Sequence, residues 1–217
     1  LAFSPDSKNL LIGTLEGEVF IIDIRTGLKT KTFLDENFIP AAYIDTVVFT
    51  SDGKTISAND MSSSIRLWDV DTRNKKDTSL DNHSGMIRSI SFSSDSKYIA
   101  SGGADGTVKL WTVETGELIY TIVNGNNGEW LTYTPEGFFT GSEWATKNLV
   151  HIVDGLEVIG IDQVYDKLYR PDLVAAKMRG EDISMYAKEV NLASLVRSGS
   201  VPVVTLENLP ENPTSRD

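Results

Sequence analysis

Three residues of the types that hydrolytic enzymes use lie close together in the sequence: His83, Ser101 and Asp105. In a nucleophilic triad, an imidazole takes the proton of a serine hydroxyl and a carboxylate orients that imidazole. The same three side chains can instead form a buried hydrogen-bonded network that does no chemistry. The choice between these interpretations depends on the elements that carry the three residues.

Residues 83–122 contain four short β-prone runs separated by three turn signals. The turns are expected at residues 94–96, 105–106 and 115–116, because small polar residues and glycine tolerate the left-handed backbone of tight hairpins. The stretch therefore predicts a four-stranded antiparallel meander, which is the unit of a propeller blade.

The same pattern recurs twice upstream. Five positions of this stretch correspond to similar residues 43 positions earlier. Phe92, Asp95, Val108, Trp111 and Thr115 correspond to Phe49, Asp52, Ile65, Trp68 and Thr72. A further 46 positions upstream, the corresponding residues are Phe3, Asp6, Val19, Ile22 and Thr26. A period in the low forties with four strands per repeat is typical of β-propellers.

The second and third repeats carry a recognisable ending. Their third strands end in Trp68-Asp69 and Trp111-Thr112, and His83 opens the third repeat. Through these residues the chain resembles the WD-repeat β-propellers. The resemblance implies a fold of several blades arranged in a ring.

The resemblance also implies a role for the triad-like group. In that family a histidine, a serine or threonine, an aspartate and the tryptophan form a hydrogen-bonded network inside each blade. By position, the network would consist of His83, Ser101, Asp105 and Trp111. The repeat therefore favours a structural network over a catalytic triad.

The other two repeats lack parts of this network. The second has Pro40 at the histidine position and Ser62 at the aspartate position, and it keeps Trp68. The first has Glu16 and Ile22 at the aspartate and tryptophan positions. Missing polar members leave the apolar packing intact, so we expect these blades to fold inside a ring as well.

The predicted fold class is all-β: a partial WD-repeat β-propeller with three recognisable four-stranded blades and a divergent fourth, followed by a short α-helical segment. The blades are expected at about 1–34, 41–80, 83–123 and 129–157, within a propeller arc over 1–159. Three blades cannot close a ring, so we interpret the chain as the C-terminal arc of a larger propeller. A small open sandwich is the alternative.

From residue 160 the apolar spacing becomes helical. Residues 160–198 are expected to form three short helices, of which the second begins at Pro171 and ends before Gly180. Val174 and Met178 are expected on one face of that helix, and the third helix over 183–196. Residues 199–217 are expected to form a linker and the first strand of a further β domain.

The runs 133–139 and 169–174 are similar to a junction found in bacterial WD-repeat proteins, where a propeller leads through a helical segment and a β-sandwich to a caspase-like peptidase domain. The resemblance covers about residues 129–206. It implies a downstream effector domain in the same polypeptide. Peptidase activity is not carried over, because no position of this chain matches a catalytic motif.

The composition excludes several functions. Thirty-one acidic and 20 basic residues give a net charge of −11, which opposes binding to nucleic acids and to anionic membranes. The absence of cysteine excludes thiol catalysis and thiolate metal sites. His151 lies in an apolar run and is expected to be a core or edge side chain. We expect no cofactor and no bound metal. The absence of cysteine is neutral about the compartment, and a cytoplasmic location is a separate expectation.

The sequence favours a non-catalytic scaffold or sensor that binds a protein or peptide partner and regulates the downstream domain. Met86 and Arg88 are candidate partner contacts at the start of the complete blade, and a solvated strand edge is the alternative for them. A propeller enzyme or small-ligand binder that uses the central channel is the second candidate function, and an architectural spacer is the third. Trp130 and Trp144 are expected in the core rather than on a ligand platform.

Overall fold

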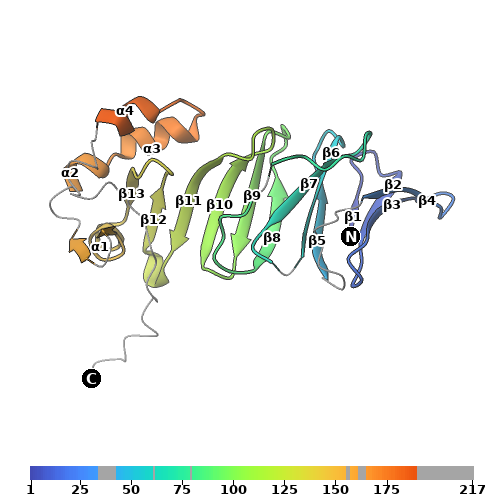
Figure 1. The fold of residues 1–217 in the computed structure, drawn as a ribbon, viewed down its shortest axis with the longest axis horizontal. Coiled ribbons are helices and arrows are strands. Elements are labelled where there is room, and N and C mark those ends of the chain that lie inside the picture. The colour runs from blue at the N-terminus through green and yellow to red at the C-terminus, as the bar shows by residue number, and fades with distance from the viewer. Residues whose placement is uncertain (34–42, 61, 79, 155–156, 161–164, 190–217) are drawn as a thin grey trace, which may run out of the picture. The chain divides into compact units, whose positions relative to one another are not determined.

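The computed structural model describes residues 1–33, 43–60, 62–78, 80–154, 157–160 and 165–189 (Figure 1). The chain divides into two compact units, residues 1–119 and residues 120–217. The described part is mostly antiparallel β-sheet with short helices near the C-terminus, so the predicted all-β class with a short helical segment is confirmed. Within these ranges no helix is long and apolar enough to cross a membrane.

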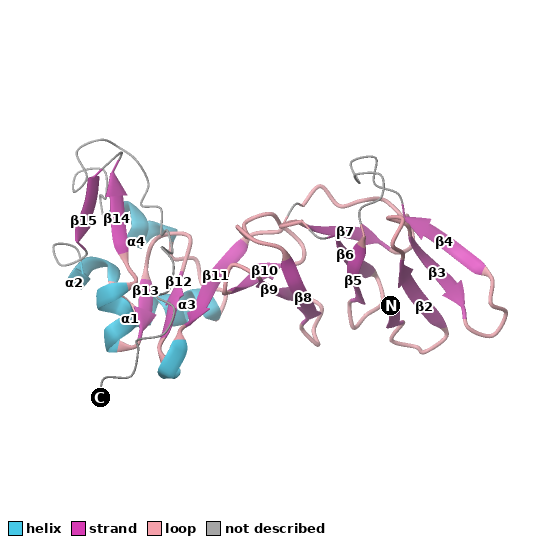
Figure 2. Ribbon diagram, turned by 90° about the horizontal axis from the view of Figure 1, so that it is seen from below, coloured by secondary structure: helices cyan, strands magenta, loops and turns pink. Residues whose placement is uncertain are grey.

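Three antiparallel sheets follow one another in the first unit (Figure 2). Sheet 1 consists of β1 (Ala2–Phe3), β2 (Asn9–Gly13), β3 (Val19–Asp23) and β4 (Lys29–Phe33). Sheet 2 consists of β5 (Ile44–Phe49), β6 (Thr55–Asp60) and β7 (Ile65–Asp69). We call β8 (Ile87–Phe92), β9 (Tyr98–Gly103) and β10 (Thr107–Thr112) sheet 3. Within each sheet, every strand pairs with the strand before it.

The first hairpin turn of each sheet is closed by the same hydrogen bond. A hydroxyl donates to the carboxylate two residues later, over 2.6 Å from Ser4 to Asp6, 2.6 Å from Thr50 to Asp52 and 2.5 Å from Ser93 to Asp95. One residue in each turn has a positive φ: 58° at Ser7, 71° at Gly53 and 60° at Ser96. The turns therefore repeat in backbone conformation as well as in sequence.

Sheets 1 and 2 share an apolar core. Sheet 1 contributes Leu11, Val19, Ile21 and Phe33, and sheet 2 contributes Ile44, Val47, Ile56, Ala58 and Trp68, with Val70 after β7. Gly13 allows the close approach of the two sheets, because a Cβ atom there would lie 2.2 Å from Cγ2 of Ile44. Any side chain at this position would force the sheets apart.

Sheets 2 and 3 share a second core of the same kind. Sheet 2 contributes Ile65 and Leu67, with Leu80 from the following segment, and sheet 3 contributes Ile87, Ile90, Ile99 and Trp111, with Val113 after β10. Across this contact, the side-chain amide of Asn59 donates to the Ile87 carbonyl over 3.1 Å. Sheet 2 is therefore covered on both faces.

Sheet 2 differs from the predicted four-stranded blade in its last strand. Among the described residues that follow β7, only isolated bridges continue the sheet, between Ile65 and Leu80 and between Trp68 and Lys75. The sequence here, with Lys75, Lys76 and Asp77, lacks the alternating apolar residues that would hold a regular fourth strand against a core.

The division between the two units falls inside β11 (Leu118–Asn124). The remaining elements are a 3-10 turn η1 (Asn126–Gly128), β12 (Trp130–Tyr133), β13 (Phe139–Gly141), α1 (Glu143–Asn148), β14 (His151–Asp154), β15 (Glu157–Gly160), α2 (Tyr165–Leu168), α3 (Pro171–Met178) and α4 (Ser184–Glu189). In the second unit β11, β12 and β13 are antiparallel neighbours.

The helices of the second unit form one core with β12 and β13. Its largest buried side chains include Leu131 and Phe139 from the strands, Phe138 from the turn before β13, and Leu173 and Val174 from α3. The backbone N–H of Arg170 donates to the Phe139 carbonyl over 3.0 Å, which fixes the start of α3 on β13. The helical segment is therefore an integral part of this unit.

The divergent fourth repeat differs from the predicted meander. Within the range expected for this repeat, 129–157, the strand β14 pairs with β15 in a separate two-stranded sheet. Between β13 and β14 the chain forms α1, which the sequence analysis did not predict. The limits of the blades and of the helical segment remain predictions.

The burial of several side chains in the second unit differs from expectation. Val174 and Met178 stand four residues apart on α3, as expected for one face, but Val174 is 1% exposed and Met178 is 43% exposed. Trp130 and Trp144, expected in the core, are 41% and 45% exposed. Pro171 occupies the first turn of α3 and Gly180 follows it with φ of 81°, as expected. The predicted continuation of α4 beyond Glu189 lies outside the described residues.

Candidate functional site

The structure brings together all four members of the predicted network. The Nε2 atom of His83 lies 2.8 Å from the Ser101 hydroxyl oxygen. On the other side of the ring, Nδ1 lies 2.9 Å from Oδ2 of Asp105. The indole N–H of Trp111 donates to the same Ser101 hydroxyl over 2.9 Å. The four side chains thus form one chain of hydrogen bonds.

Three strands of sheet 3 and the loops between them hold these residues in place. His83 precedes β8, Ser101 lies in β9, Asp105 lies in the β9–β10 turn and Trp111 lies in β10. Gly103 leaves room for the ring, because a Cβ atom there would lie 2.5 Å from Nδ1 of His83. The network therefore depends on correct pairing of all three strands.

Asp105 is the most heavily bonded member of the group. It accepts hydrogen bonds from the backbone N–H groups of Ser84 and Thr107, both over 3.0 Å. The Thr107 hydroxyl donates to it over 2.8 Å. Thr107 is 4% exposed, and the sequence analysis missed it. Part of the signal was available, since an aspartate in a turn commonly accepts the backbone N–H of the residue two positions later.

The direction of the hydrogen bonds gives the protonation states. Because Ser101 accepts the indole N–H, its own proton is free to donate to Nε2 of His83. The Nδ1–H group of His83 then donates to the Asp105 carboxylate. Burial lowers the pKa of His83, although the hydrogen bond and charge of Asp105 act against that decrease. The arrangement is that of a neutral imidazole.

The carboxylate is ionised in the same arrangement. Burial acts to raise the pKa of Asp105, but the hydrogen bonds from Thr107, His83 and the backbone together outweigh burial and hold that pKa below its usual value. Proximity to Asp105 partly offsets the decrease that burial causes in the pKa of Lys109, which is 3% exposed. A buried carboxylate with this many donors is stable without a bound ligand.

The distances alone would suit a nucleophilic triad, but burial does not. The side chain of His83 is fully buried, and Ser101 is 1% exposed. A substrate carbonyl cannot reach the Ser101 oxygen, which is already occupied by the Trp111 indole. This geometry ties the strands of sheet 3 together and leaves no open nucleophile.

Comparison with known families agrees with this geometry. Residues 74–112 match the family described as WD domain, G-beta repeat. The chain thus contains one WD40 repeat, and the matched residues include His83, Ser101, Asp105 and Trp111. No curated protein matches the chain.

Sheet 2 keeps the tryptophan and replaces the rest of the network. Trp68 is fully buried, while Pro40 at the histidine position lies outside the described residues. Here the Arg66 guanidinium donates to Asp60 over 2.9 Å, and Asp60 also accepts the backbone N–H of Ser62. The sequence analysis missed this ion pair, because Asp60 does not occupy a position of the WD pattern.

The predicted partner contacts lie at the exposed start of β8. Met86 is 40% exposed and Arg88 is exposed. The backbone beneath them is fixed, since the Met86 carbonyl accepts the N–H of Ala104 over 2.7 Å. Only the side chains are therefore free to meet a partner.

Sheet 2 presents a matching pair that the sequence analysis did not single out. Tyr43 and Asp45 stand 43 positions before Met86 and Arg88, at the start of β5, and both are exposed, Tyr43 by 51%. Strands β5 and β8 are neighbours in the first unit. We call Tyr43, Asp45, Met86 and Arg88 the contact surface. The repeat offset is the signal that could have identified its second half.

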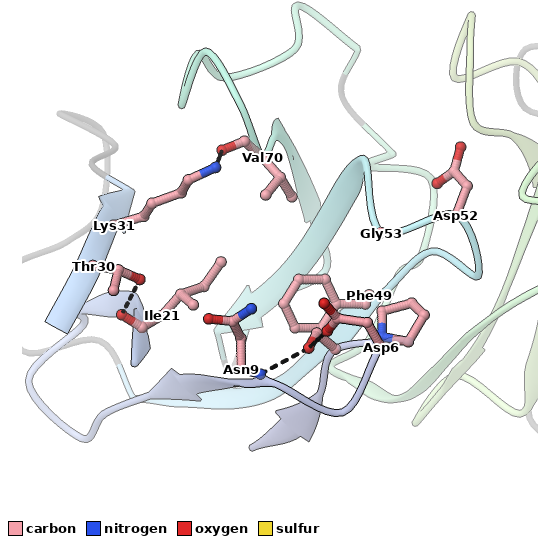
Figure 3. Close-up of a pocket in the computed structure, with 11 residues that line it drawn as sticks. Asp6, Asn9, Ile21, Thr30, Lys31, Phe49, Asp52, Gly53 and Val70 are labelled. Carbon is pink, nitrogen blue, oxygen red and sulfur yellow. Dashed lines mark hydrogen bonds between the residues drawn. The ribbon is translucent and has the colours of Figure 1, made fainter. Parts of the chain in front are cut away.

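A cavity of about 270 Å³ opens between sheets 1 and 2, beside Asp6, Asn9 and Phe49 (Figure 3). Lys31 crosses from sheet 1 to donate to the Val70 carbonyl over 2.8 Å. A cavity of about 430 Å³ occupies the matching place between sheets 2 and 3. Because sheet packing produces both cavities with different linings, we assign no ligand to either.

No group of histidine and acidic side chains within the described ranges is arranged to hold a metal ion. His151 lies in β14, and its side chain lies outside the described part of the structure.

Proposed function

We propose that the chain is a non-catalytic protein-binding module and that the contact surface binds the partner. WD40 repeat domains typically act as scaffolds for protein interactions, and the match to that repeat supports a protein partner in general. The observation that carries the proposal is the contrast between Ser101, which is buried, and Met86, which is exposed just before β8 on a backbone held by the hydrogen bond from Ala104.

The contact surface has the composition of a protein-binding site. Tyr43 and Met86 offer apolar area, and the tyrosine also offers a hydroxyl. Arg88 and Asp45 add opposite charges on neighbouring strands, which orient a partner during association. Tyrosine and arginine are enriched among the residues that dominate binding energies. The surface therefore suits a peptide or protein segment that carries both apolar and charged groups.

A second part of the proposal concerns regulation. We infer that partner binding controls an effector domain downstream in the same polypeptide, of the caspase-like peptidase type that the junction resembles. The shared core of α3 with the hairpin of β12 and β13 supports this regulatory role. A displacement of that hairpin would move α3 with it.

Site-specific photocrosslinking in the full-length protein tests the binding site. A photoreactive amino acid at position 86 or 43 should capture the partner in the host cell. The same amino acid at Leu28, which is 66% exposed in a turn of sheet 1, serves as the control and should capture little.

The charge-reversal variant Arg88→Glu should weaken binding about tenfold while leaving folding intact, because the side chain is exposed. Titration of the captured partner onto the purified variant measures this loss. Equal crosslinking at positions 86 and 28, or unchanged affinity of Arg88→Glu, would contradict the proposed surface.

A further inference from the structure

The turn between β12 and β13 is the fourth copy of a turn that sheets 1, 2 and 3 also contain. In those three sheets a hydroxyl donates to the carboxylate two residues later. Thr134 and Glu136 occupy the same two places in the fourth turn. The backbone N–H of Gly137 donates to the Thr134 carbonyl over 2.9 Å, and Gly137 has φ of 92°, so the backbone closes as it does in the other three turns.

The side-chain bond of this turn is absent, although both residue types are present. The Thr134 hydroxyl oxygen has no hydrogen-bond partner in the described part of the chain, and the residue is 1% exposed. The hairpin is also one residue shorter, because the Thr134 N–H donates to the Phe138 carbonyl four residues ahead, whereas the first three turns span five. A buried hydroxyl without a partner destabilises the arrangement that buries it.

Glu136 binds a helix instead of its own turn. Its Oε1 atom accepts a hydrogen bond from Nζ of Lys177, in the last turn of α3, over 2.8 Å. The side chains of Glu136 and Lys177 are 16% and 11% exposed. The glutamate is one methylene longer than the aspartates of the first three turns, which gives it the reach to another element. Its second oxygen, Oε2, is buried and unpaired within the described ranges.

The helix α3 is therefore held on the hairpin near both ends. At its start the Arg170 N–H donates to the Phe139 carbonyl over 3.0 Å, and in its last turn Lys177 binds Glu136. Val174, between these two contacts, is buried in the shared core. If Glu136 released Lys177, the last turn of α3 could move while its start stayed in place.

We propose that Glu136 is a latch with two positions. In the first position, which the structure shows, it binds Lys177 and holds the last turn of α3. In the second position its carboxylate accepts the Thr134 hydroxyl, as the carboxylates of the other three turns accept theirs, and the last turn of α3 is released. The unpaired hydroxyl and the unpaired Oε2 atom make the first position less stable than a fully satisfied ion pair, so the two positions lie closer in free energy.

The role of the latch rests on the regulatory part of the proposed function. The helix α4 follows the last turn of α3, so a shift of the latch would move the segment that leads on from the hairpin. An element with two discrete arrangements is what energetic coupling between sites requires. The latch itself is tested without a partner, so its failure would leave the contact surface untouched, and a failure of the contact surface would leave the latch untouched.

Hydrogen exchange of the full-length protein measures the release of α3. In Glu136→Asp the shorter carboxylate suits the Thr134 hydroxyl, as in the other turns, and no longer reaches Lys177. The amides of Arg179 and Gly180, which bond to the last turn of α3, should then exchange at least about tenfold faster, while the amides of β12 keep their wild-type rates.

Glu143→Asp is the matched control for this change. Glu143 also pairs with a lysine, Lys147, but both side chains are exposed on α1. This variant should leave the exchange of Arg179 and Gly180 unchanged.

Thr134→Val separates the latch from a simple ion pair, with the exchange of the Gly137 amide as the measurement. In the wild type the change removes an unpaired hydroxyl and should slow this exchange. In Glu136→Asp it removes a bonded hydroxyl and should make the exchange faster. Lys177→Met frees Glu136 without changing the turn, and Thr134→Val should speed the exchange in that background too.

The reversal of sign between backgrounds is the expected result. Wild-type exchange of Arg179 and Gly180 in Glu136→Asp would overturn the proposal. A change at Gly137 in the same direction when Thr134→Val is made in the wild type, in Glu136→Asp and in Lys177→Met would also overturn it, because the hydroxyl would then never bind the carboxylate.

Discussion

The imidazole of His83 joins a serine hydroxyl on one side to a carboxylate on the other, inside the WD40 repeat. Replacing His83 or Asp105 by alanine leaves buried donors or acceptors without partners. We expect each change to lower the free energy of unfolding by about 1 to 3 kcal/mol. Urea denaturation of the purified variants measures the loss.

Glu114→Ala, an exposed change just after β10, is the control and should alter the free energy of unfolding by no more than about 0.5 kcal/mol. A hydrolytic activity that disappears in His83→Ala and Asp105→Ala, while their unfolding curves stay like the wild type, would favour the triad.

The low pKa of His83 makes stability depend on pH. The unfolded histidine has a pKa of about 6.5, and burial lowers that of the folded state. Between the folded and the unfolded pKa of His83, the unfolded chain therefore binds more protons than the folded chain. The free energy of unfolding decreases as the pH falls below about 6.5, and the decrease is complete below the folded pKa. The nearby charges of Asp105 and Lys109 have opposite effects on this shift.

The measurement is the urea midpoint between pH 8 and pH 5. His83→Gln should remove the part of the pH dependence that belongs to this imidazole. Asp105 has a lower pKa in the folded state, so the pH dependence that its carboxylate adds to stability lies below about pH 4, outside this range. A wild-type profile identical to that of His83→Gln would show that His83 does not titrate as described.

Single residues were predictable where they belong to one repeat. His83, Ser101, Asp105 and Trp111 all lie within 83–111, so one pattern specified them. The exposure of Trp130 and Trp144 was not predictable, because aromatic residues indicate burial only on average and the neighbouring elements decide their surroundings.

The side chains of α3 differ in how deeply they are buried. Val174 is 1% exposed in α3, among the buried side chains of the second unit. Val174→Asp places a carboxylate in this core without a partner, so we expect the free energy of unfolding to decrease by about 3 kcal/mol or more. Hydrogen exchange of β12 and β13 and thermal denaturation measure the change.

Met178→Asp is the matched control on the same helix. Its side chain is 43% exposed, and the change should cost no more than about 0.5 kcal/mol. Equal destabilisation by the two aspartate variants would contradict the assignment of Val174 to the core.

Elements were predictable where local signals are strong. Turn residues and alternating apolar positions located the strands of sheets 1 and 3, and Pro171 and Gly180 located α3. The pairing of β14 with β15 was not predictable, because strand periodicity indicates a strand without indicating its neighbour. The short helix α1 has two buried residues, Ala145 and Thr146, too few to produce a helical period.

The organisation of the whole molecule depends on which surfaces share a core. In the second unit the predicted fourth blade and the helical segment share one core, which a sequence with two successive periodicities does not indicate. The regulatory part of the proposed function depends on this core. A small truncation of a buried side chain should loosen the core without unfolding the second unit.

In the full-length protein, Val174→Ala should reduce the response of effector activity to the partner at least about threefold, while Met178→Ala leaves it unchanged. Effector activity with and without the partner is the measurement. Normal control in Val174→Ala, together with a measured loss of stability, would show that the helices act only as a tether.

The hydroxyl–carboxylate bonds in the first turns of sheets 1, 2 and 3 also affect the order of folding. In each turn the same hydroxyl accepts a backbone N–H five residues ahead, from Asn9 to Ser4, Thr55 to Thr50 and Tyr98 to Ser93. Loops this short close in well under a microsecond, far faster than sheets can dock. Three equivalent hairpins can therefore nucleate independently, and the docking of one sheet on the next sets the folding rate.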